Sequence, residues 1–350
     1  MKRTMTKILS LTLASALLAL GVGCSGGSEN TAATQTGGDS TEQTASSELP
    51  DVVNIGTMNL VNGDLIAQYE KLYEEELGVK VNLQLFDSGR DVNTAIAAGS
   101  IDISQAGTSP TALGLSSDVP YEVIWLADII GSAESLVVKN ESGIRDIQGL
   151  KGKKVATPFA STAHYSLLNA LKLAGVEESE VTILDLQPQD IFAAWQRGDI
   201  DAAYVWYPIL DKLLEDGTVI THSGELAKKG IVTGDATVVR KEFGEKYPDI
   251  VSKYLQIQIK ANDIILNDKD KAAEEVASVL EISAEDAANQ LSQFEYLTAD
   301  EELDYLNNKL AEILKNTADF LVEQQSITSA PSLDDFKASI NTSYLEAAAK

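Results

Sequence analysis

The chain has very few of the residues that build metal centres, disulfides or thiol nucleophiles. Cysteine occurs once, at Cys24, and histidine occurs twice, at His164 and His222. A single cysteine cannot close a disulfide within the chain. So small a set also argues against a zinc site or a Cys/His nucleophile pair. We therefore expect no metal, no cofactor and no catalytic residues of these kinds.

Positive charge is also scarce, because 27 Lys and Arg residues face 53 Asp and Glu residues, and the net charge is −26. A surface this acidic repels phosphate backbones, so the sequence predicts no nucleic-acid partner. The phosphate-binding pattern GxxxxGK[ST] is absent. After the first 23 residues no further apolar run is long enough to span a bilayer.

The N-terminus has the pattern of an export signal. Lys2, Arg3 and Lys7 precede an apolar run from Ile8 to Gly23, which is typical of a secretory signal peptide at residues 1–23. An uncleaved transmembrane anchor is the alternative. Cys24 directly follows this run, as in the lipobox of bacterial lipoproteins, so we predict lipidation at Cys24 and a protein held at the extracytoplasmic face of the cell membrane. The pattern departs from a lipobox at Gly21, because Leu20 lies one place too early, and an unused thiol is the alternative.

Residues 24–50 contain the cysteine followed by Ser, Gly, Thr, Gln and Glu with almost no large apolar side chain. Such a segment cannot bury enough surface to fold, and we predict a flexible tether. A coil of about 26 residues would span roughly 25–30 Å. The remaining 300 residues or so favour a body of two domains or lobes.

Short apolar runs alternate with helical patterns over the first part of this body. Expected strands are 52–58, 79–86, 101–107, 121–128, 135–139 and 153–158, with later runs VTILDL, DAAYVW, TVI and DATVVR. Helices are expected at 64–77, after residue 107, and at 162–175. This alternation predicts βαβ units with parallel pairing. From Glu242 to about Gln325 the pattern is almost entirely helical.

The change of pattern suggests how the chain divides. We predict a first part of lobe 1 at residues 51–130, lobe 2 at 131–236, and a return to lobe 1 with C-terminal helices at 237–350. The fold class is therefore α/β, two-lobed, with mixed, mostly parallel sheets and a helical C-terminal tail.

Polar residues follow several expected strands at the edge where open parallel sheets bind ligands. Free N–H groups at a helix N-terminus favour an anion, although each Ser or Thr there can equally be a plain N-cap. The candidates at these strand ends are Asp87, Ser88, Thr108, Ser109, Ser161, Thr162, Tyr165 and Trp206.

Whole segments of the chain resemble one known family. FDSG, GTSP, SAESLVVK, GKKVATPFASTAHYSLL, LQPQDIFAAWQRGDIDAAYVWYP and VVRKEF are similar to the taurine-binding components of bacterial ABC importers. The resemblance runs from about Val52 to the C-terminus and implies a periplasmic-binding-protein-like fold that delivers a sulfonate to a membrane permease. The wider family binds alkanesulfonates, nitrate and thiamine precursors. The junction TMNLVNGD departs from the family pattern, which puts contacts from Met58, Asn59 and Asp64 in doubt.

Taurine has a sulfonate at one end and an ammonium at the other, so its two ends need different partners. The sulfonate only accepts hydrogen bonds and suits the N–H and O–H donors around Thr108–Ser109 and Ser161–Thr162. The ammonium suits a carboxylate or an aromatic face. Glu134, Asp235 and Asp87 are the carboxylate candidates, and Trp206 is the ring. Two alternatives stay open: a binding protein for other aliphatic sulfonates, and an enzyme on the same scaffold.

Four aromatic rings fall between Trp195 and Pro208. We expect Trp206 in the ligand cleft, Trp195 in a lobe interior, and Tyr207 in support of a helix start. Asp102 and Asp201 stand in similar Gly-x-Ile-Asp turns, and we expect both to have turn and strand-edge roles.

Overall fold

The computed structural model describes residues 49–350 of the chain. The predicted signal peptide, Cys24 and nearly all of the predicted tether therefore lie outside the described residues. Within residues 49–350, no helix is both long enough and apolar enough to cross a membrane.

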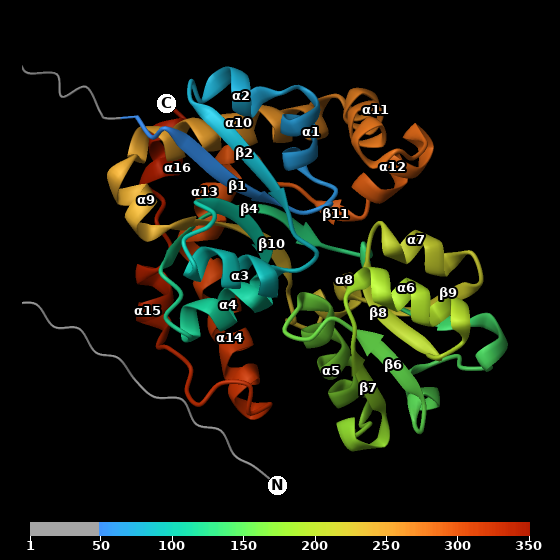
Figure 1. Cartoon of the computed structure of the whole chain (residues 1–350). Helices are drawn as coiled ribbons and strands as arrows, with labels where there is room; N and C mark the ends of the chain where they lie inside the picture. The colour runs from blue at the N-terminus through green and yellow to red at the C-terminus, as the bar shows by residue number, and fades with distance from the viewer. Residues whose placement is uncertain (1–48) are drawn as a thin grey trace, which may run out of the picture. The chain divides into compact units, whose positions relative to one another are not determined.

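Two β-sheets organise the described part of the chain (Figure 1). Sheet A has six strands in the order β11-β4-β10-β3-β1-β2. Strand β1 pairs in parallel with β2 and β3, whereas β10 runs antiparallel to β3 and β4. Its strands are β1 (Val52–Thr57), β2 (Lys80–Leu85), β3 (Ile103–Gly107), β4 (Tyr121–Ile130), β10 (Gly234–Arg240) and β11 (Phe294–Glu295).

Sheet B has five strands in the order β7-β6-β8-β5-β9 and is drawn in green and yellow in Figure 1. Strand β6 pairs in parallel with β7 and β8, whereas β5 runs antiparallel to β8 and β9. Its strands are β5 (Glu134–Lys139), β6 (Lys154–Thr157), β7 (Thr182–Asp185), β8 (Ala202–Trp206) and β9 (Gly217–His222).

The two mixed sheets and the helical C-terminal region agree with the predicted fold class, but the expected excess of parallel pairing is wrong. Four of the nine strand pairings in residues 49–350 are parallel. The antiparallel pairings involve β4, β5 and β10, which carry the chain from one sheet to the other and back. A strand that enters a sheet from the neighbouring lobe runs against the βαβ direction, so the alternation pattern alone did not reveal it.

Helices cover both sheets and fill the C-terminal region. Those of the first part are α1 (Gly63–Tyr69), α2 (Leu72–Glu76), α3 (Gly89–Ala97) and α4 (Thr108–Ser116). Those that accompany sheet B are α5 (Thr162–Ala174), α6 (Pro188–Arg197), α7 (Ile209–Leu214) and α8 (Ser223–Ala227). The rest are α9 (Lys241–Lys246), α10 (Pro248–Asn267), α11 (Lys269–Leu280), α12 (Ala284–Leu291), α13 (Ala299–Asn308), α14 (Leu310–Glu323), α15 (Leu333–Ala338) and α16 (Ser343–Ala348).

The predicted helix at 64–77 is interrupted, because Lys71 has a left-handed backbone with φ of 57° and separates α1 from α2. Regular helix cannot pass through such a residue. The predicted helical run after Glu242 is confirmed from α9 to α14, except that β11 inserts two strand residues between α12 and α13.

The two Gly-x-Ile-Asp turns have equivalent structural roles in the two sheets. Asp102, just before β3, accepts a hydrogen bond from the backbone N–H of Asn54 in β1 at 2.9 Å. Asp201, just before β8, accepts one from the backbone N–H of Lys154 in β6, also at 2.9 Å. Each carboxylate therefore joins neighbouring parallel strands at their amino ends, which confirms the expected turn and edge roles.

Strand register brings distant acidic residues together at the border between the sheets. On β10, Asp235 lies opposite Gly107 of β3 on one side and Asp128 of β4 on the other. On β5, Glu134 lies opposite Trp206 of β8. The crossing between the lobes, from Ile130 to Glu134, thus begins and ends beside these groups.

Candidate functional site

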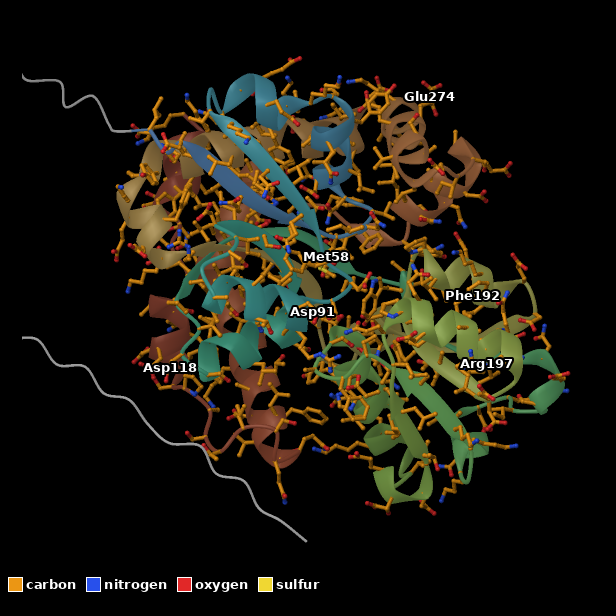
Figure 2. The ribbon with its side chains drawn as sticks, in the orientation of Figure 1. Met58, Asp91, Asp118, Phe192, Arg197 and Glu274 are labelled. Atoms are coloured by element: carbon orange, nitrogen blue, oxygen red, sulfur yellow. The ribbon has the colours of Figure 1, made fainter. Side chains whose placement is uncertain are left out.

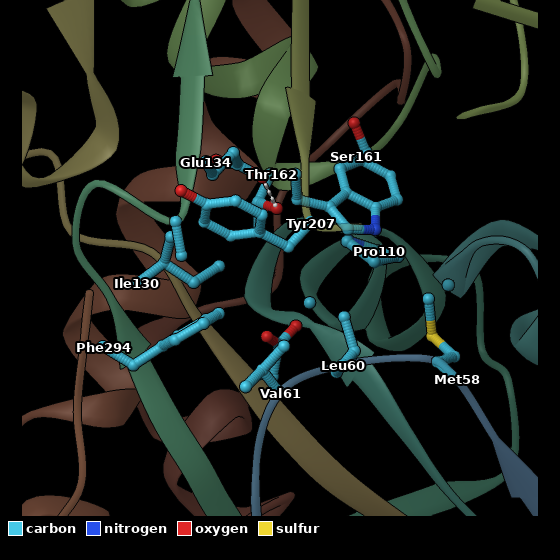
Figure 3. A pocket seen from close by; sticks show the side chains of 15 residues that line it. Met58, Leu60, Val61, Pro110, Ile130, Glu134, Ser161, Thr162, Tyr207 and Phe294 are labelled. Atoms are coloured by element: carbon cyan, nitrogen blue, oxygen red, sulfur yellow. Dashed lines mark hydrogen bonds between the residues drawn. The ribbon is translucent and has the colours of Figure 1, made fainter. Parts of the chain in front are cut away.

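A cavity opens where elements of sheet A, including β11, meet elements of sheet B, and its empty space is about 460 Å³ including the part open to solvent. Figure 3 shows the side chains that point toward it. The lining residues are Met58, Leu60, Val61, Gly89, Gly107, Pro110, Ile130, Ala133, Glu134, Ser161, Thr162, Trp206, Tyr207, Asp235 and Phe294.

One end of the cavity is made of helix N-termini. The lining residues Gly89, Gly107 and Thr162 stand at the first residues, or the N-cap, of α3, α4 and α5. Neither α3 nor α4 has a side chain that caps its first backbone N–H groups. Unpaired N–H groups together with the positive end of the helix dipole attract anions. This end is therefore suited to a group that only accepts hydrogen bonds.

Two glycines allow these helix N-termini to lie close together. A Cβ atom on Gly107 would lie 2.8 Å from the Cγ2 atom of Thr162, which belongs to the other lobe. A Cβ atom on Gly89 would lie 2.5 Å from the Cγ atom of Pro110. Both separations are too short for real carbon contacts, so glycine at these positions permits the approach of α3, α4 and α5.

Glu134 provides a buried carboxyl that also lines the cavity, next to the start of α5. One of its oxygens accepts hydrogen bonds from Thr162 Oγ1 at 2.5 Å, and the other accepts from Ser223 Oγ at 2.6 Å and Ser166 Oγ at 3.4 Å. Burial raises the pKa of Glu134 to about 7, the hydroxyl hydrogen bonds lower it, and the charge of Asp235 raises it. Hydroxyl donors favour the charged form, but burial outweighs them, so Glu134 keeps its proton to a higher pH than an exposed glutamate does.

Asp235 and Asp128 form a second acidic element beside Glu134. Burial, followed by the charge of Asp128, raises the pKa of Asp235 well above its usual range. Burial also raises the pKa of Asp128 to about 7, although the hydrogen bond that it accepts from Asn62 lowers it. No Lys, Arg or His of residues 49–350 acts on any of these three acids. Buried carboxyls without a positive partner are costly, and they favour a ligand that brings a positive charge.

Apolar and aromatic side chains form the rest of the cavity wall. Trp206 and Tyr207 follow one another at the end of β8, and Phe294 comes from β11 (Figure 3). The hydroxyl of Tyr207 accepts a hydrogen bond from Gln293 Nε2 at 2.8 Å, which fixes the ring. Aromatic faces pack against short alkyl chains and attract ammonium groups.

The structure brings five of the ten predicted ligand-binding residues into the lining: Glu134, Ser161, Thr162, Trp206 and Asp235. Trp195 lies in the interior as expected, 2% exposed, with its Nε1 donating to Asp216 Oδ1 at 2.6 Å. Tyr204 is also buried, and its hydroxyl lies 3.2 Å from Ser223 Oγ. Of the four rings in the 195–208 stretch, two therefore line the cavity and two are core.

The other predicted residues do not line the cavity. Asp87 is exposed, and Ser88 is the N-cap of α3 with its hydroxyl donating to Asp91 Oδ2 at 3.0 Å. Thr108 is buried with its hydroxyl oxygen 3.4 Å from the backbone N of Gly234, and Ser109 is buried behind the first turn of α4.

The expectation for Tyr165 is wrong in its geometry, because its ring packs edge-on against Phe320 of α14, with centroids 5.0 Å apart. It lies one turn beyond Thr162, on the α5 face that meets the C-terminal helices. The role assigned to Tyr207 also changes, since this ring lines the cavity.

Several lining residues were not among the sequence candidates. Met58 lies where the two lobes meet in Figure 2, after β1, in the segment whose departure from the family pattern had put it in doubt. Leu60, Val61 and Ile130 also follow strand ends, and this position was the available signal for them. No signal in the sequence indicated Phe294, because it lies in a helical region far along the chain.

Comparisons with known proteins show the family of the chain. The family model described as "substrate binding domain of ABC-type glycine betaine transport system" matches residues 51–288. The "Taurine-binding periplasmic protein" of Escherichia coli (strain K12) is 38% identical over 268 residues, which cover 75% of this chain and 83% of that protein.

Two solved structures share the fold. The alkanesulfonate-binding protein from Xanthomonas axonopodis pv. citri, bound to MOPS, has a TM-score of 0.71 and 20% identity, covering 85% of this chain and 100% of that one. A desulfurization enzyme has a TM-score of 0.62 and 14% identity, covering 86% of this chain and 99% of that one. The same fold therefore occurs in binding proteins and in an enzyme.

Proposed function

Because the chain belongs to the family of ABC-type substrate-binding domains, we propose that it captures taurine in the cavity between its lobes and delivers it to an ABC permease. One observation carries the choice of ligand. Glu134 and Asp235 are buried carboxyls without a positive partner, and they line the same cavity as three helix N-termini. The site thus combines acidic side chains with backbone N–H groups that attract anions, which is the complement of a zwitterion.

In the proposed complex, the sulfonate accepts hydrogen bonds from the N-termini of α3, α4 and α5. The ammonium contacts Glu134 and Asp235, and the two methylene groups pack against Trp206, Tyr207 and Phe294. Each end of the ligand then meets its electrostatic complement in a cavity that excludes most water. The relative whose name includes taurine supports this assignment.

A simple alkanesulfonate is the first alternative, and an alkanesulfonate-binding protein shares the fold. Such a ligand would satisfy the helix N-termini but would leave two buried carboxyls without a positive partner. Leaving one partner of a buried pair uncompensated costs about 2–4 kcal/mol. The acidic end therefore favours taurine.

An enzyme on the same scaffold is the second alternative, since a desulfurization enzyme shares the fold. Within the lining, the nucleophile candidates are the hydroxyls of Ser161 and Thr162. Ser161 Oγ donates to the Pro158 carbonyl at 2.6 Å, and Thr162 Oγ1 donates to Glu134. Histidine, the usual general base, does not line the cavity. These arrangements favour binding without turnover.

The proposal includes a location. We propose that the protein acts outside the cytoplasm, anchored by lipid on Cys24, with residues 24–50 as a tether. Residues 51–130 with 237–350, and residues 131–236, would be the two lobes that close on the ligand and present a surface to the permease.

Calorimetry with a panel of ligands tests the proposal. Taurine should bind at least about tenfold more tightly than ethanesulfonate or ethanolamine, because each lacks one of the two charged ends. Equal affinity for taurine and ethanesulfonate would assign the site to alkanesulfonates in general. Incubation with taurine followed by mass spectrometry should show unchanged ligand, whereas product formation would support the enzyme.

A further inference from the structure

Asp128 is a buried acid that does not itself line the cavity but stands opposite Asp235, which does. The two residues are direct cross-strand partners on the antiparallel strands β4 and β10, so their side chains lie on the same face of the sheet. Asp128 Oδ2 also accepts from Asn62 Nδ2 at 3.0 Å, and the same amide nitrogen donates to Gln105 Oε1 at 2.9 Å. Asp128 is 1% exposed and Asp235 is 5% exposed, so neither is screened by water.

We propose that Asp128 and Asp235 hold one proton between them in the empty site and release it when the ammonium of the ligand arrives. Asp128 is thereby a positioning residue that makes amine recognition depend on pH. This inference rests on the proposed function, because it requires a ligand with a positive charge at the Asp235 end.

The direct cross-strand pairing of two buried carboxyls is the first support. Two like charges held side by side without water are unfavourable, so one of the two carboxyls keeps a proton. Acid pairs of this kind titrate as a unit, with one proton held to an unusually high pH.

The surroundings are the second support, because they supply no positive charge. Glu134 faces the pair from β5, and Glu302 faces Asp128 from α13, where its carboxyl accepts from the backbone N–H of Leu126. The phenol of Tyr296 lies near both aspartates and donates to the carbonyl of Val61 at 2.5 Å. Every titratable neighbour is therefore acidic or neutral, and a second negative charge on the pair has no compensation until a ligand enters.

The charges balance in the binding step. The empty pair has one proton and a net charge of −1. An arriving ammonium supplies +1, which stabilises the second carboxylate, and the proton leaves to solvent or buffer. The bound state then has a dicarboxylate beside an ammonium. Ethanesulfonate lacks the ammonium, so its binding does not lower the pKa of the pair and the proton stays bound.

Calorimetry in buffers with different ionisation enthalpies counts the protons released on binding and so tests the proposal. Near pH 7 the wild type should release about half a proton or more with taurine, and none with ethanesulfonate. Taurine affinity should rise about threefold or more between pH 6 and pH 8, because the pair loses its proton more easily at higher pH.

Asp128→Asn is the informative variant, since an asparagine donates permanently to Asp235 and holds no titrating proton. Its taurine affinity should match that of the wild type at acid pH and rise less between pH 6 and pH 8, and binding should release fewer protons than in the wild type, because only Glu134 can still give up a proton to the ammonium. Glu134→Gln is the matched control. It removes the other cavity acid but leaves the pair intact, so residual taurine binding should still release a proton.

The outcomes separate the inference from the proposed function. If taurine fails to bind the wild type at any pH, the proposed function fails and this inference fails with it. If taurine binds without proton release, only the inference fails. Release that is undiminished in Asp128→Asn but disappears in Glu134→Gln would assign the proton to Glu134 alone and overturn the inference. If Asp128→Asn does not fold, the wild-type count and the Glu134→Gln count still decide between these results.

Discussion

The cavity combines two kinds of polar group, backbone N–H groups and side-chain carboxyls. The anion-seeking end uses backbone N–H groups at the starts of α3, α4 and α5, and glycines allow these helices to approach. The acidic part uses the carboxyls of Glu134 and Asp235, with Asp128 next to Asp235. Backbone dipoles do not titrate and cannot be removed by a side-chain substitution, whereas carboxyls can be titrated and replaced. We therefore expect selectivity and pH dependence to come mainly from the acidic end.

The largest expected effect is at Asp235. Asp235→Asn keeps the shape of the side chain but removes its charge, so taurine affinity should fall by about 2–4 kcal/mol. Ethanesulfonate should be affected less, because it has no ammonium to lose a partner. The affinity ratio of the two ligands, measured by calorimetry, is the informative quantity. An equal loss for both would mean that Asp235 supports the loop or hinge, and the amine would then be read by Glu134 or Trp206.

The acidic end should also make the ligand-free protein less stable at higher pH. Burial raises the pKa of Glu134 to about 7 in the folded state, above its ordinary value of 4.5. Between these two values the folded state holds a proton that the unfolded state has lost, so the free energy of unfolding falls as pH rises. For Glu134 alone the full decrease is about 3–4 kcal/mol.

Urea unfolding of the wild type and of Glu134→Gln at pH 5 and pH 8 measures this effect. The wild type should lose more stability between the two pH values than the variant, because glutamine does not titrate. The comparison between the proteins cancels the general repulsion of an acidic surface. Identical pH dependence in both would show that the pKa of Glu134 is not raised in the folded state.

The helix N-termini and the carboxyl groups also differed in how well they could be predicted from the sequence. Ser161 and Thr162 could be found because they stand between an apolar strand pattern and a helix pattern. Trp206 was found because it ends a strand. Asp128 was not found, since its contact with Asp235 depends on the antiparallel register of β4 and β10, which no local pattern encodes.

The face of a helix on which a residue lies, and the contacts between distant segments, were harder still to predict from the sequence. Tyr165 lies on the same helix as Thr162, yet it faces Phe320 of α14, a helix more than a hundred residues later in the chain. Phe294 reaches the cavity from a two-residue strand inside a helical region. Local periodicity predicts the type of an element, but the neighbours of its side chains are decided by tertiary packing.

The aromatic part of the cavity wall should contribute to the affinity for both ligands. Trp206→Ala removes apolar contact from taurine and ethanesulfonate alike, and it removes a ring face near the ammonium from taurine only. Taurine affinity should fall by about 1–3 kcal/mol, and that of ethanesulfonate by somewhat less. Thermal unfolding provides the control, because a core tryptophan deletion would cost roughly 3–5 kcal/mol of stability. A loss of that size would place the main role of Trp206 in packing.

The smallest expected effect is at the backbone end, where Gly107→Ala tests the helix convergence directly. The φ angle of Gly107 is −55°, so alanine fits the backbone there without strain. Its Cβ atom would, however, lie 2.8 Å from Cγ2 of Thr162 and would push α5 away from α4. Sulfonate affinity should fall by about 1–2 kcal/mol. Taurine and ethanesulfonate should lose equally, because both place the same group at this end. Gly63→Ala, a glycine of α1 that does not line the cavity, is the matched control and should leave both affinities unchanged. If Gly107→Ala weakened taurine alone, the disturbance would reach the acidic end through the hydrogen bond from Thr162 to Glu134, and the two ends would not be independent.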